Sequence, residues 1–287
     1  MSYLKVRDVD HYYEWVRSDS ESSAPKNVMV FVHGWGGSCR YWRTVAEQLS
    51  DRFDCLLYDL RGFGRSQPSP EIPLDQLKTV YDVESYATDL AALLEGLGVE
   101  EVYLHAHSMG STIATMFVNR YPERVKKTIL ACNGIFEYDA KSFNAFHRFG
   151  GWVVKFRPPW MLAIPGLKDI FMARFLTQSI PGNQKFEFLE DFVLADYQAA
   201  LGTMLTSVSQ ETATSMPDEF AQVKQPTLLI SGECDQIIPA EMGAKAAELN
   251  PQISYQMIEK TGHFPMLEKP EQYLNQVSEF LCLSPLP

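Results

Sequence analysis

The sequence has few cysteines and no long apolar run. Its five cysteines are scattered, odd in number and without CxxC spacing, so we expect neither a disulfide framework nor a zinc site. No stretch reaches the roughly 18 uninterrupted apolar residues of a membrane span. Residues 1–20 carry charges every few positions and lack the apolar core of a signal peptide. We therefore expect a protein of the reducing cytoplasm with no integral membrane segment.

Positive charge and cofactor motifs are also scarce. The chain has 25 Lys and Arg residues against 36 Asp and Glu residues, a formal net charge of -11, which opposes binding to phosphate backbones and to anionic lipid headgroups. The patterns GxxxxGK[ST] and HExxH and a dinucleotide fingerprint after the first strand are missing. We expect no nucleic-acid partner, no cofactor and no metal; the motifs say nothing about oligomeric state.

Strand-like and helix-like segments alternate along most of the 287 residues. Apolar runs that suit buried strands are followed by segments of helical period, which predicts an α/β fold, with a mostly parallel sheet of about eight strands flanked by helices. We expect strands at 28–33, 53–58, 101–106, 127–132, 226–231 and 253–258, an antiparallel edge hairpin within 2–16, and helices at 40–50, 82–97, 109–120, 240–249 and 270–282.

Residues 134–216 break this alternation. A connection in such a sheet usually needs one helix and roughly 2 to 6 loop residues, so the longer segment predicts a helical lid inserted after the sixth strand. The main domain would then comprise residues 1–133 and 217–287. The lid is rich in Phe, Trp, Tyr and Met. We expect most of these side chains to pack the lid's own core and the rest to line an apolar pocket that faces the sheet.

The strongest chemical motif is Ala106-His107-Ser108-Met109-Gly110, between a predicted strand and a predicted helix. A serine at a sharp strand-to-helix turn presents its hydroxyl at the carboxyl edge of the sheet, and the tight backbone requires small flanking residues. Ala106 and Gly110 meet that need, although alanine replaces the glycine of the usual G-x-S-x-G pattern. Ser108 is therefore the predicted nucleophile.

A serine hydroxyl needs a neighbouring imidazole to remove its proton. His263 follows the last predicted strand in the loop Thr261-Gly262-His263-Phe264-Pro265, where its side chain can reach the same edge of the sheet. The alternative is that His263 is an ordinary surface residue. The other five histidines have competing assignments: His11 in the edge hairpin, His105 in a buried strand, His107 in a packing role, His147 in the lid and His33 in the loop after the first central strand.

The imidazolium formed during proton transfer needs a carboxylate partner. Asp235 lies directly beyond the predicted strand 226–231, at the same edge, and Glu233 is a competitor two residues earlier. The resulting chain order of Ser108, Asp235 and His263 matches one of the three known arrangements of such triads and excludes the other two.

Acyl transfer also needs hydrogen-bond donors for an oxyanion. We expect the backbone N–H of Met109, at the helix N-terminus, and that of Trp35, in the glycine-rich loop His33-Gly34-Trp35-Gly36-Gly37. The Trp35 ring is equally suited to form a pocket wall. We expect Trp35, Phe136 and Phe264 to contact the substrate.

Five motifs carry a resemblance to a known family. They are HGWGGS, DLRGFGRS, AHSMGS, SGECDQIIP and GHFPMLEKPEQ, and they extend from residue 33 to beyond residue 270. The sequence resembles the α/β-hydrolase fold superfamily, in the lid-bearing branch that includes serine esterases, lactonases, carbon–carbon bond hydrolases and cofactor-free perhydrolases. The resemblance implies a Ser-Asp-His triad at the three residues named above. It also implies that Asp59, Arg61 and Ser66 of DLRGFGRS organise a loop rather than catalyse.

The resemblance and the motifs together predict a serine hydrolase. The expected substrate is a small carboxylic ester or related acyl compound with an apolar moiety, cleaved through an acyl-serine intermediate. Relatives that open epoxides or displace halide use an aspartate nucleophile, so those reactions are not expected. Carbon–carbon bond hydrolysis and perhydrolysis use the same triad and stay open. A small-ligand receptor on the same fold is the alternative from another class.

Overall fold

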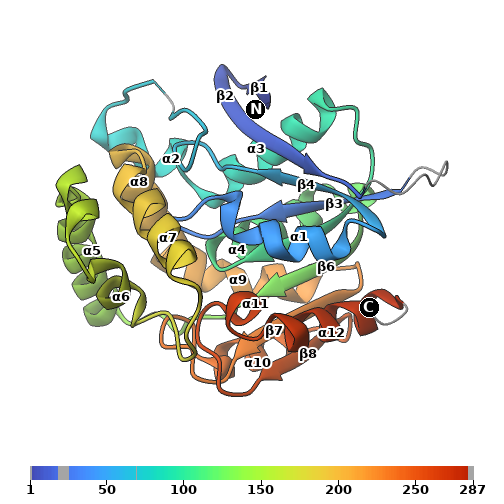
Figure 1. Ribbon diagram of the computed structural model, residues 1–287. Helices are drawn as coiled ribbons and strands as arrows, with labels where there is room; N and C mark the ends of the chain where they lie inside the picture. The colour runs from blue at the N-terminus through green and yellow to red at the C-terminus, as the bar shows by residue number, and fades with distance from the viewer. Residues whose placement is uncertain (1, 19–25, 69, 284–287) are drawn as a thin grey trace.

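The computed structural model describes residues 2–18, 26–68 and 70–283 (Figure 1). The strands are β1 (Ser2–Val6), β2 (Val9–Val16), β3 (Asn27–Val32), β4 (Phe53–Tyr58), β5 (Val102–His107), β6 (Val125–Ala131), β7 (Thr227–Gly232) and β8 (Ile253–Ile258). The helices outside the long β6–β7 connection are α1 (Arg43–Leu49), α2 (Leu77–Val80), α3 (Val83–Gly96), α4 (Met109–Arg120), α10 (Ala240–Glu248), α11 (Pro265–Glu268) and α12 (Pro270–Leu281), with short 3-10 helices η1 (Cys39–Trp42), η2 (Leu74–Gln76) and η3 (Pro122–Arg124).

Within the described residues the eight strands form one sheet in the order β1-β2-β4-β3-β5-β6-β7-β8. The β1–β2 and β2–β4 pairs are antiparallel, and the other five pairs are parallel. Helices α3, α4 and α10 pack on one face, and α1 and α12 pack on the other. The predictions of a mostly parallel sheet, of about eight strands and of a hairpin at one edge are confirmed.

Strand β3 shows why the central strands read as continuous apolar runs. Met29 and Phe31 point into the cluster under α1 and α12, whereas Val30 and Val32 point into the cluster under α3 and α4. Side chains alternate across a strand, so both faces of β3 are buried by helices and each position is apolar.

The sheet order places the functional loops along one edge. Strand β3 lies between β4 and β5, so the connections from β3 and from β5 leave in opposite directions along the sheet. In open α/β sheets this switch point, at the carboxyl ends of the strands, is where ligands bind. The loops after β3, β5, β7 and β8 all begin at this edge, which brings their side chains together.

The β6–β7 connection forms a helical insertion after the sixth strand, as predicted (Figure 1). We call residues 132–226 the insertion. It contains α5 (Ala140–Lys155), η4 (Pro159–Ala163), α6 (Leu167–Met172), α7 (Gly182–Leu194), α8 (Tyr197–Ser207) and α9 (Gln210–Gln222). The predicted boundary after residue 216 falls inside α9, which is held to α4 by bonds from Asn119 and Arg120 to Glu219.

The aromatic residues of the insertion correct one expectation. Phe143, Phe188 and Phe192 are buried as predicted, but many others are exposed. The exposed aromatics are Tyr138, Phe146, Phe149, Trp152, Phe156, Trp160, Phe186 and Tyr197. The reason is that α5 contacts α8 along one side only, where Gly150 lies against the Met204 sulfur. Most aromatics of α5 therefore do not form a lid core.

Two further findings concern cysteine and membrane spanning. All five cysteines lie in the described ranges as free thiols, and Cys39, Cys55 and Cys132 are buried. None of the described helices combines the length and the apolar character needed to cross a bilayer.

Asp59 fastens the loop after β3 to the end of β4. Its fully buried carboxylate accepts hydrogen bonds from Cys39 N (2.8 Å), Arg65 N (2.8 Å) and Arg65 Nε (2.9 Å). Ser66 Oγ donates to the Asp59 carbonyl (2.6 Å), and Arg61 Nε donates to Asp89 (2.9 Å). The DLRGFGRS segment therefore organises a loop, as the resemblance implied.

Asp59→Ala should destabilise the fold by about 3 kcal/mol or more, because it leaves two backbone amides and a guanidinium without their acceptor. Urea unfolding followed by circular dichroism measures the effect. Asp54→Ala is the matched control: Asp54 pairs with Arg17 at the surface, where such a pair contributes about 1 kcal/mol or less. Equal losses in the two variants would contradict this account of the loop.

Candidate active site

Ser108 occupies a strained turn between β5 and α4. Its backbone has φ 54° and ψ -126°, a region that non-glycine residues rarely adopt and that costs on the order of 1 to 3 kcal/mol. The Ser108 N–H donates to the carbonyl of Ala131 on the neighbouring strand at 2.9 Å, which helps to hold the turn. The half-buried side chain stands at the carboxyl edge of the sheet.

Two glycines allow the backbone to close around this turn. A Cβ atom at Gly110 would lie 2.5 Å from the carbonyl oxygen of His33, and a Cβ atom at Gly34 would lie 3.0 Å from Cβ of Ser108. Helix α4 can therefore approach β3, and the loop after β3 can approach Ser108, only without side chains at these positions. Ala106, by contrast, is a fully buried strand residue paired with Val32 and Leu130.

The structure brings the three predicted polar residues into one hydrogen-bonded chain. His263 Nε2 lies 3.0 Å from Ser108 Oγ, and His263 Nδ1 lies 2.7 Å from Asp235 Oδ2. Both His263 and Asp235 are buried, at 4% and 5% exposed. This geometry places a general base beside a hydroxyl and a carboxylate behind the base, which is the arrangement that activates a serine.

The Asp235 carboxylate is held in its charged form. Burial by itself raises its pKa, but the charge and hydrogen bond of His263 and the N–H groups of Ile237 and Ile238 outweigh burial and lower the pKa overall. The two N–H groups donate to Asp235 Oδ1 at 2.8 and 3.0 Å, which leaves Oδ2 free to face the imidazole.

Glu233, the competing acid, has a different role. It is exposed, and its carboxylate accepts a hydrogen bond from Lys260 N at 2.8 Å. That bond ties the loop after β7 to the loop after β8. Of the two acids, the structure therefore brings only Asp235 to His263.

His107 lies beneath the site as a fixed neutral bridge. Its Nε2 lies 2.7 Å from the carbonyl oxygen of His263, so Nε2 carries the proton and Nδ1 accepts from the Tyr41 hydroxyl at 3.0 Å. The Tyr41 oxygen in turn accepts from Gly34 N at 2.5 Å. Burial lowers the pKa of His107 and raises that of Tyr41. The sequence predicted packing for His107 but gave no signal for Tyr41.

Glu268 is a second residue that the sequence reasoning missed. Its buried carboxylate accepts from Gly262 N (2.8 Å) in the histidine loop and from Thr177 N (2.7 Å) and Gln178 N (2.6 Å) in the insertion. The backbone N–H of His263 also donates to the Phe175 carbonyl at 2.7 Å. The insertion and the histidine loop are thus one hydrogen-bonded unit. The only sign of this role in the sequence is that Glu268 lies five residues after His263, in the same loop-to-helix segment.

The two predicted oxyanion donors flank Ser108. Met109 is the first residue of α4, so its N–H has no acceptor one turn back in the helix. The backbone N–H of Trp35 follows Gly34, which packs against Ser108, and it has no acceptor among the residues that the structure describes. Gly36, with φ 71°, completes the turn that holds this loop. Both N–H groups are available to a ligand.

The three predicted substrate contacts have different surroundings. Trp35 is half-buried, donates from Nε1 to the Ala200 carbonyl (3.0 Å) and packs on Phe192. Phe264 is only 1% exposed and packs edge-on against Phe188 at 5.0 Å, so it supports the site from within the core rather than offering an open surface. Phe136 lines a cavity of about 10 Å³ whose lining includes neither Ser108 nor His263.

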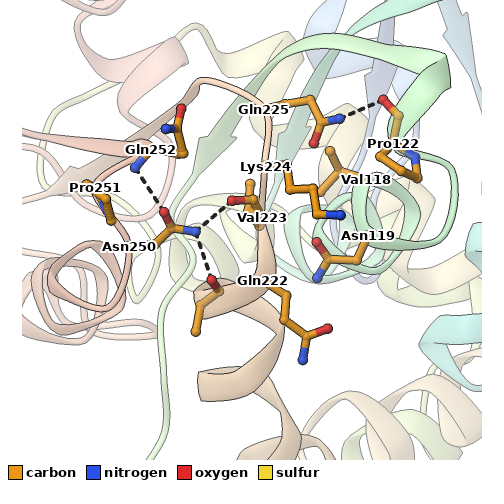
Figure 2. Close-up of a pocket in the computed structure, with 11 residues that line it drawn as sticks. Val118, Asn119, Pro122, Gln222, Val223, Lys224, Gln225, Asn250, Pro251 and Gln252 are labelled. Atoms are coloured by element: carbon orange, nitrogen blue, oxygen red, sulfur yellow. Dashed lines mark hydrogen bonds between the residues drawn. The ribbon is translucent and has the colours of Figure 1, made fainter.

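The larger of the two described cavities lies away from this site. It has a volume of about 580 Å³ and is lined by Asn119 at the C-terminal end of α4, by Val223 to Gln225 before β7, and by Asn250 before β8 (Figure 2). These residues lie at the C-terminal end of α4 or precede their strands, so the cavity is at the amino edge of the sheet. Ser108 is at the opposite, carboxyl edge.

Three potential ligand atoms meet near the site but do not form a metal-binding set. Atoms of His107, Cys132 and His263 lie within 4.8 Å of one another. Both ring nitrogens of each histidine already have hydrogen-bond partners. Burial and the nearby Asp235 charge raise the pKa of the Cys132 thiol well above its usual value, which disfavours the thiolate that a metal needs.

Comparisons with known proteins agree with this architecture. A model of the alpha/beta hydrolase fold family matches residues 27–270. The chain is similar to the uncharacterized hydrolase YugF of Bacillus subtilis, 25% identical over 96% of each chain, and to 2-hydroxy-6-oxo-2,4-heptadienoate hydrolase of Pseudomonas putida, 23% identical over 89% of each. The structure of a thermophilic esterase from Thermogutta terrifontis superposes with a TM-score of 0.77 at 22% identity, covering 98% of this chain and 97% of that one.

Asp235→Asn should slow the reaction of Ser108 with a fluorophosphonate probe on the order of 10³-fold or more, because asparagine fills the same space but favours the wrong imidazole tautomer. The second-order labelling rate of the folded protein measures this. Glu233→Gln is the matched control, and we expect it to label at the wild-type rate. A comparable loss in Glu233→Gln would refute the assignment of Asp235.

Glu268→Gln should loosen both segments that its carboxylate joins, because an amide offers one acceptor oxygen and turns an NH₂ group toward N–H donors. We expect a loss of about 2 kcal/mol in unfolding free energy and faster amide hydrogen exchange at 175–178 and 262–264. The exposed Glu271→Gln serves as control. Unchanged exchange in both segments would show that Glu268 does not couple them.

Proposed function

The chain belongs to the alpha/beta hydrolase fold family and is a hydrolase, and we propose that it is a serine hydrolase that cleaves a carboxylic ester, or a related acyl compound, with an apolar moiety. The observation that carries this proposal is the hydrogen-bonded chain from Ser108 through His263 to Asp235. It combines a strained, presented hydroxyl with a base and a buried carboxylate, which is what acyl transfer to serine needs.

In the proposed reaction, Ser108 Oγ attacks the ester carbonyl while its proton passes to His263 Nε2. Asp235 holds the imidazole orientation and balances the imidazolium charge. The N–H groups of Trp35 and Met109 donate to the oxyanion, and each such donor typically contributes about 3 kcal/mol in the transition state. His263 then protonates the leaving alcohol.

Water completes the proposed cycle. With the alcohol gone, His263 takes a proton from a water molecule, which attacks the acyl-serine carbonyl. Collapse of the second tetrahedral intermediate releases the acid and returns the proton to Ser108. No step calls for a metal or an organic cofactor.

An apolar substrate is supported by the aromatic residues that the insertion places around the site. Phe192 packs on Trp35 (5.7 Å between ring centroids) and on Phe171 (4.8 Å), and Phe175 lies 6.2 Å from the His263 ring. Apolar walls with a few placed polar groups are typical of small-molecule sites. We propose that the insertion acts as a lid over this site.

Carbon–carbon bond hydrolysis is the second candidate. The similarity to 2-hydroxy-6-oxo-2,4-heptadienoate hydrolase favours it, and a ketone carbonyl would meet the same triad and the same donors.

We further propose a reducing, cytoplasmic location, which suits five free thiols.

Hydrolysis of p-nitrophenyl esters graded from acetate to palmitate tests the proposed function. We expect turnover with a preference for longer acyl chains than acetate, and a loss on the order of 10³-fold or more in Ser108→Ala. Ser111→Ala, in the same helix, is the control for a lost hydroxyl. Faster cleavage of a 2-hydroxy-6-oxo-dienoate than of every ester would select the carbon–carbon hydrolase. Ligand binding without turnover of either class would select a receptor.

A further inference from the structure

Helix α5 has an apolar side that faces away from the protein. Its inner side is formed by Phe143 and Val154, which are buried, and by Gly150 against Met204. At about 100° per residue, Phe149 and Trp152 lie on the opposite side, and Phe156 continues the same row just beyond the helix. The helix is therefore apolar on two sides, and only one of them is packed.

Four exposed rings lie along this outer side and the segment just after it, and we call them the aromatic face: Phe149, Trp152, Phe156 and Trp160, at 68%, 70%, 63% and 59% exposed. The Phe156 and Trp160 rings contact each other edge-to-face, 6.3 Å between centroids. Scattered exposed rings are ordinary, but a contiguous apolar patch of this kind marks a surface that binds something. None of the described parts of the chain covers it.

A row of basic side chains borders the aromatic face. Lys141, Arg148 and Lys155 follow one another at seven-residue spacing on α5, which places them on one line beside Trp152. All three are exposed, and none forms an ion pair with a residue that the structure describes. Their charges are therefore directed to solvent.

The charge of this region is opposite to that of the whole protein. Residues 140–175 contain six Lys or Arg residues and a single acidic residue, Asp169, while the chain has a net charge of -11. Asp169 is itself paired with Lys185 at 2.9 Å. The overall charge, which led us to expect repulsion from anionic lipids, therefore does not describe this surface.

We infer that the aromatic face docks the protein on a bilayer surface that contains anionic lipids. Trp and Phe side chains would insert at the level of the headgroups, and Lys141, Arg148 and Lys155 would contact lipid phosphates. Helix α5 has 16 residues, about 24 Å in length, so it lies in the interface plane rather than across the bilayer. The inference does not depend on the proposed ester chemistry.

The basic row favours a lipid surface over a second copy of the chain for two reasons. A twofold symmetric contact through the aromatic face would bring two rows of Lys141, Arg148 and Lys155 together, and like charges in contact oppose association. An anionic membrane surface instead attracts the basic row and accepts the rings in the same encounter.

Docking in this way would bring the insertion, and the carboxyl edge beneath it, toward the membrane. Helix α5 packs on α8, and α8 contacts the loop after β3 through the bond from Trp35 Nε1 to the Ala200 carbonyl. An apolar molecule dissolved in the bilayer would then be close to the site that holds Ser108.

Vesicle sedimentation of the full-length protein tests the inference. Phosphatidylcholine vesicles are compared with vesicles that contain phosphatidylglycerol in addition. We expect binding to the anionic vesicles, weakening as salt is raised, and about a 10-fold or greater loss of partitioning in the double variant Phe149→Ser, Trp152→Ser. The triple variant Lys141→Glu, Arg148→Glu, Lys155→Glu should lose at least as much.

Matched controls separate docking from general changes. Leu74→Ser removes an apolar side chain that is 68% exposed elsewhere, and Lys78→Glu reverses an exposed cation on α2 that has no ion pair within the described ranges. Both should bind vesicles as the wild type does, and all variants should keep the wild-type urea midpoint because the altered side chains are exposed.

Three outcomes would overturn the inference. They are no binding of the wild type to anionic vesicles at low salt, equal binding of the aromatic double variant, and a concentration-dependent dimer that the double variant abolishes. The last result would assign the aromatic face to a second copy. Hydrolysis of a soluble short ester, measured in parallel, reports on Ser108 separately, so a failure of docking and a failure of the proposed function give different results.

Discussion

The neutral imidazole of His107 is the interaction on which the geometry of the site depends. Because it is buried, it stays uncharged, and an uncharged imidazole has one donor and one acceptor nitrogen. The donor is fixed by the His263 carbonyl and the acceptor by the Tyr41 hydroxyl, which also holds Gly34 N. The loops after β3 and β8 are thereby set relative to β5, and Ser108 lies between them.

The sequence was sufficient for the parts of the fold that rest on local patterns. Strand runs, the turn at Ser108, and loops that follow β7 and β8 each have a signature within a few residues, so the meeting of Ser108, Asp235 and His263 followed from the parallel order of the strands. Glu268 could not be found this way, because two of its partners are backbone N–H groups about ninety residues earlier. Tyr41 is hidden for the same reason.

The insertion shows the limit of composition as a guide. Its aromatic richness predicted a lid core, yet composition does not reveal which side of a helix meets a neighbour. Gly150 decides this for α5, since the missing side chain admits Met204 and turns Phe149 and Trp152 outward. The net charge was a poor guide to lipid binding for the same reason, because it sums the acidic remainder of the chain and the basic segment 140–175. A sum over the chain carries no information about where charges lie.

The hydrogen bond from the backbone N–H of His263 to the Phe175 carbonyl, together with the Glu268 carboxylate, couples the position of the insertion to that of the histidine loop. Residues 175–178 cannot move away from the sheet without breaking the hydrogen bonds that hold the backbone at Gly262 and His263. If the insertion opened at this border, His263 would move away from Ser108 at the same time. A route to Ser108 that leaves His263 in place would therefore have to form along another border of the insertion, such as the one where α8 contacts the loop after β3 through the bond from Trp35 Nε1 to the Ala200 carbonyl. Access to Ser108 and the position of His263 would then depend on different borders of the same insertion.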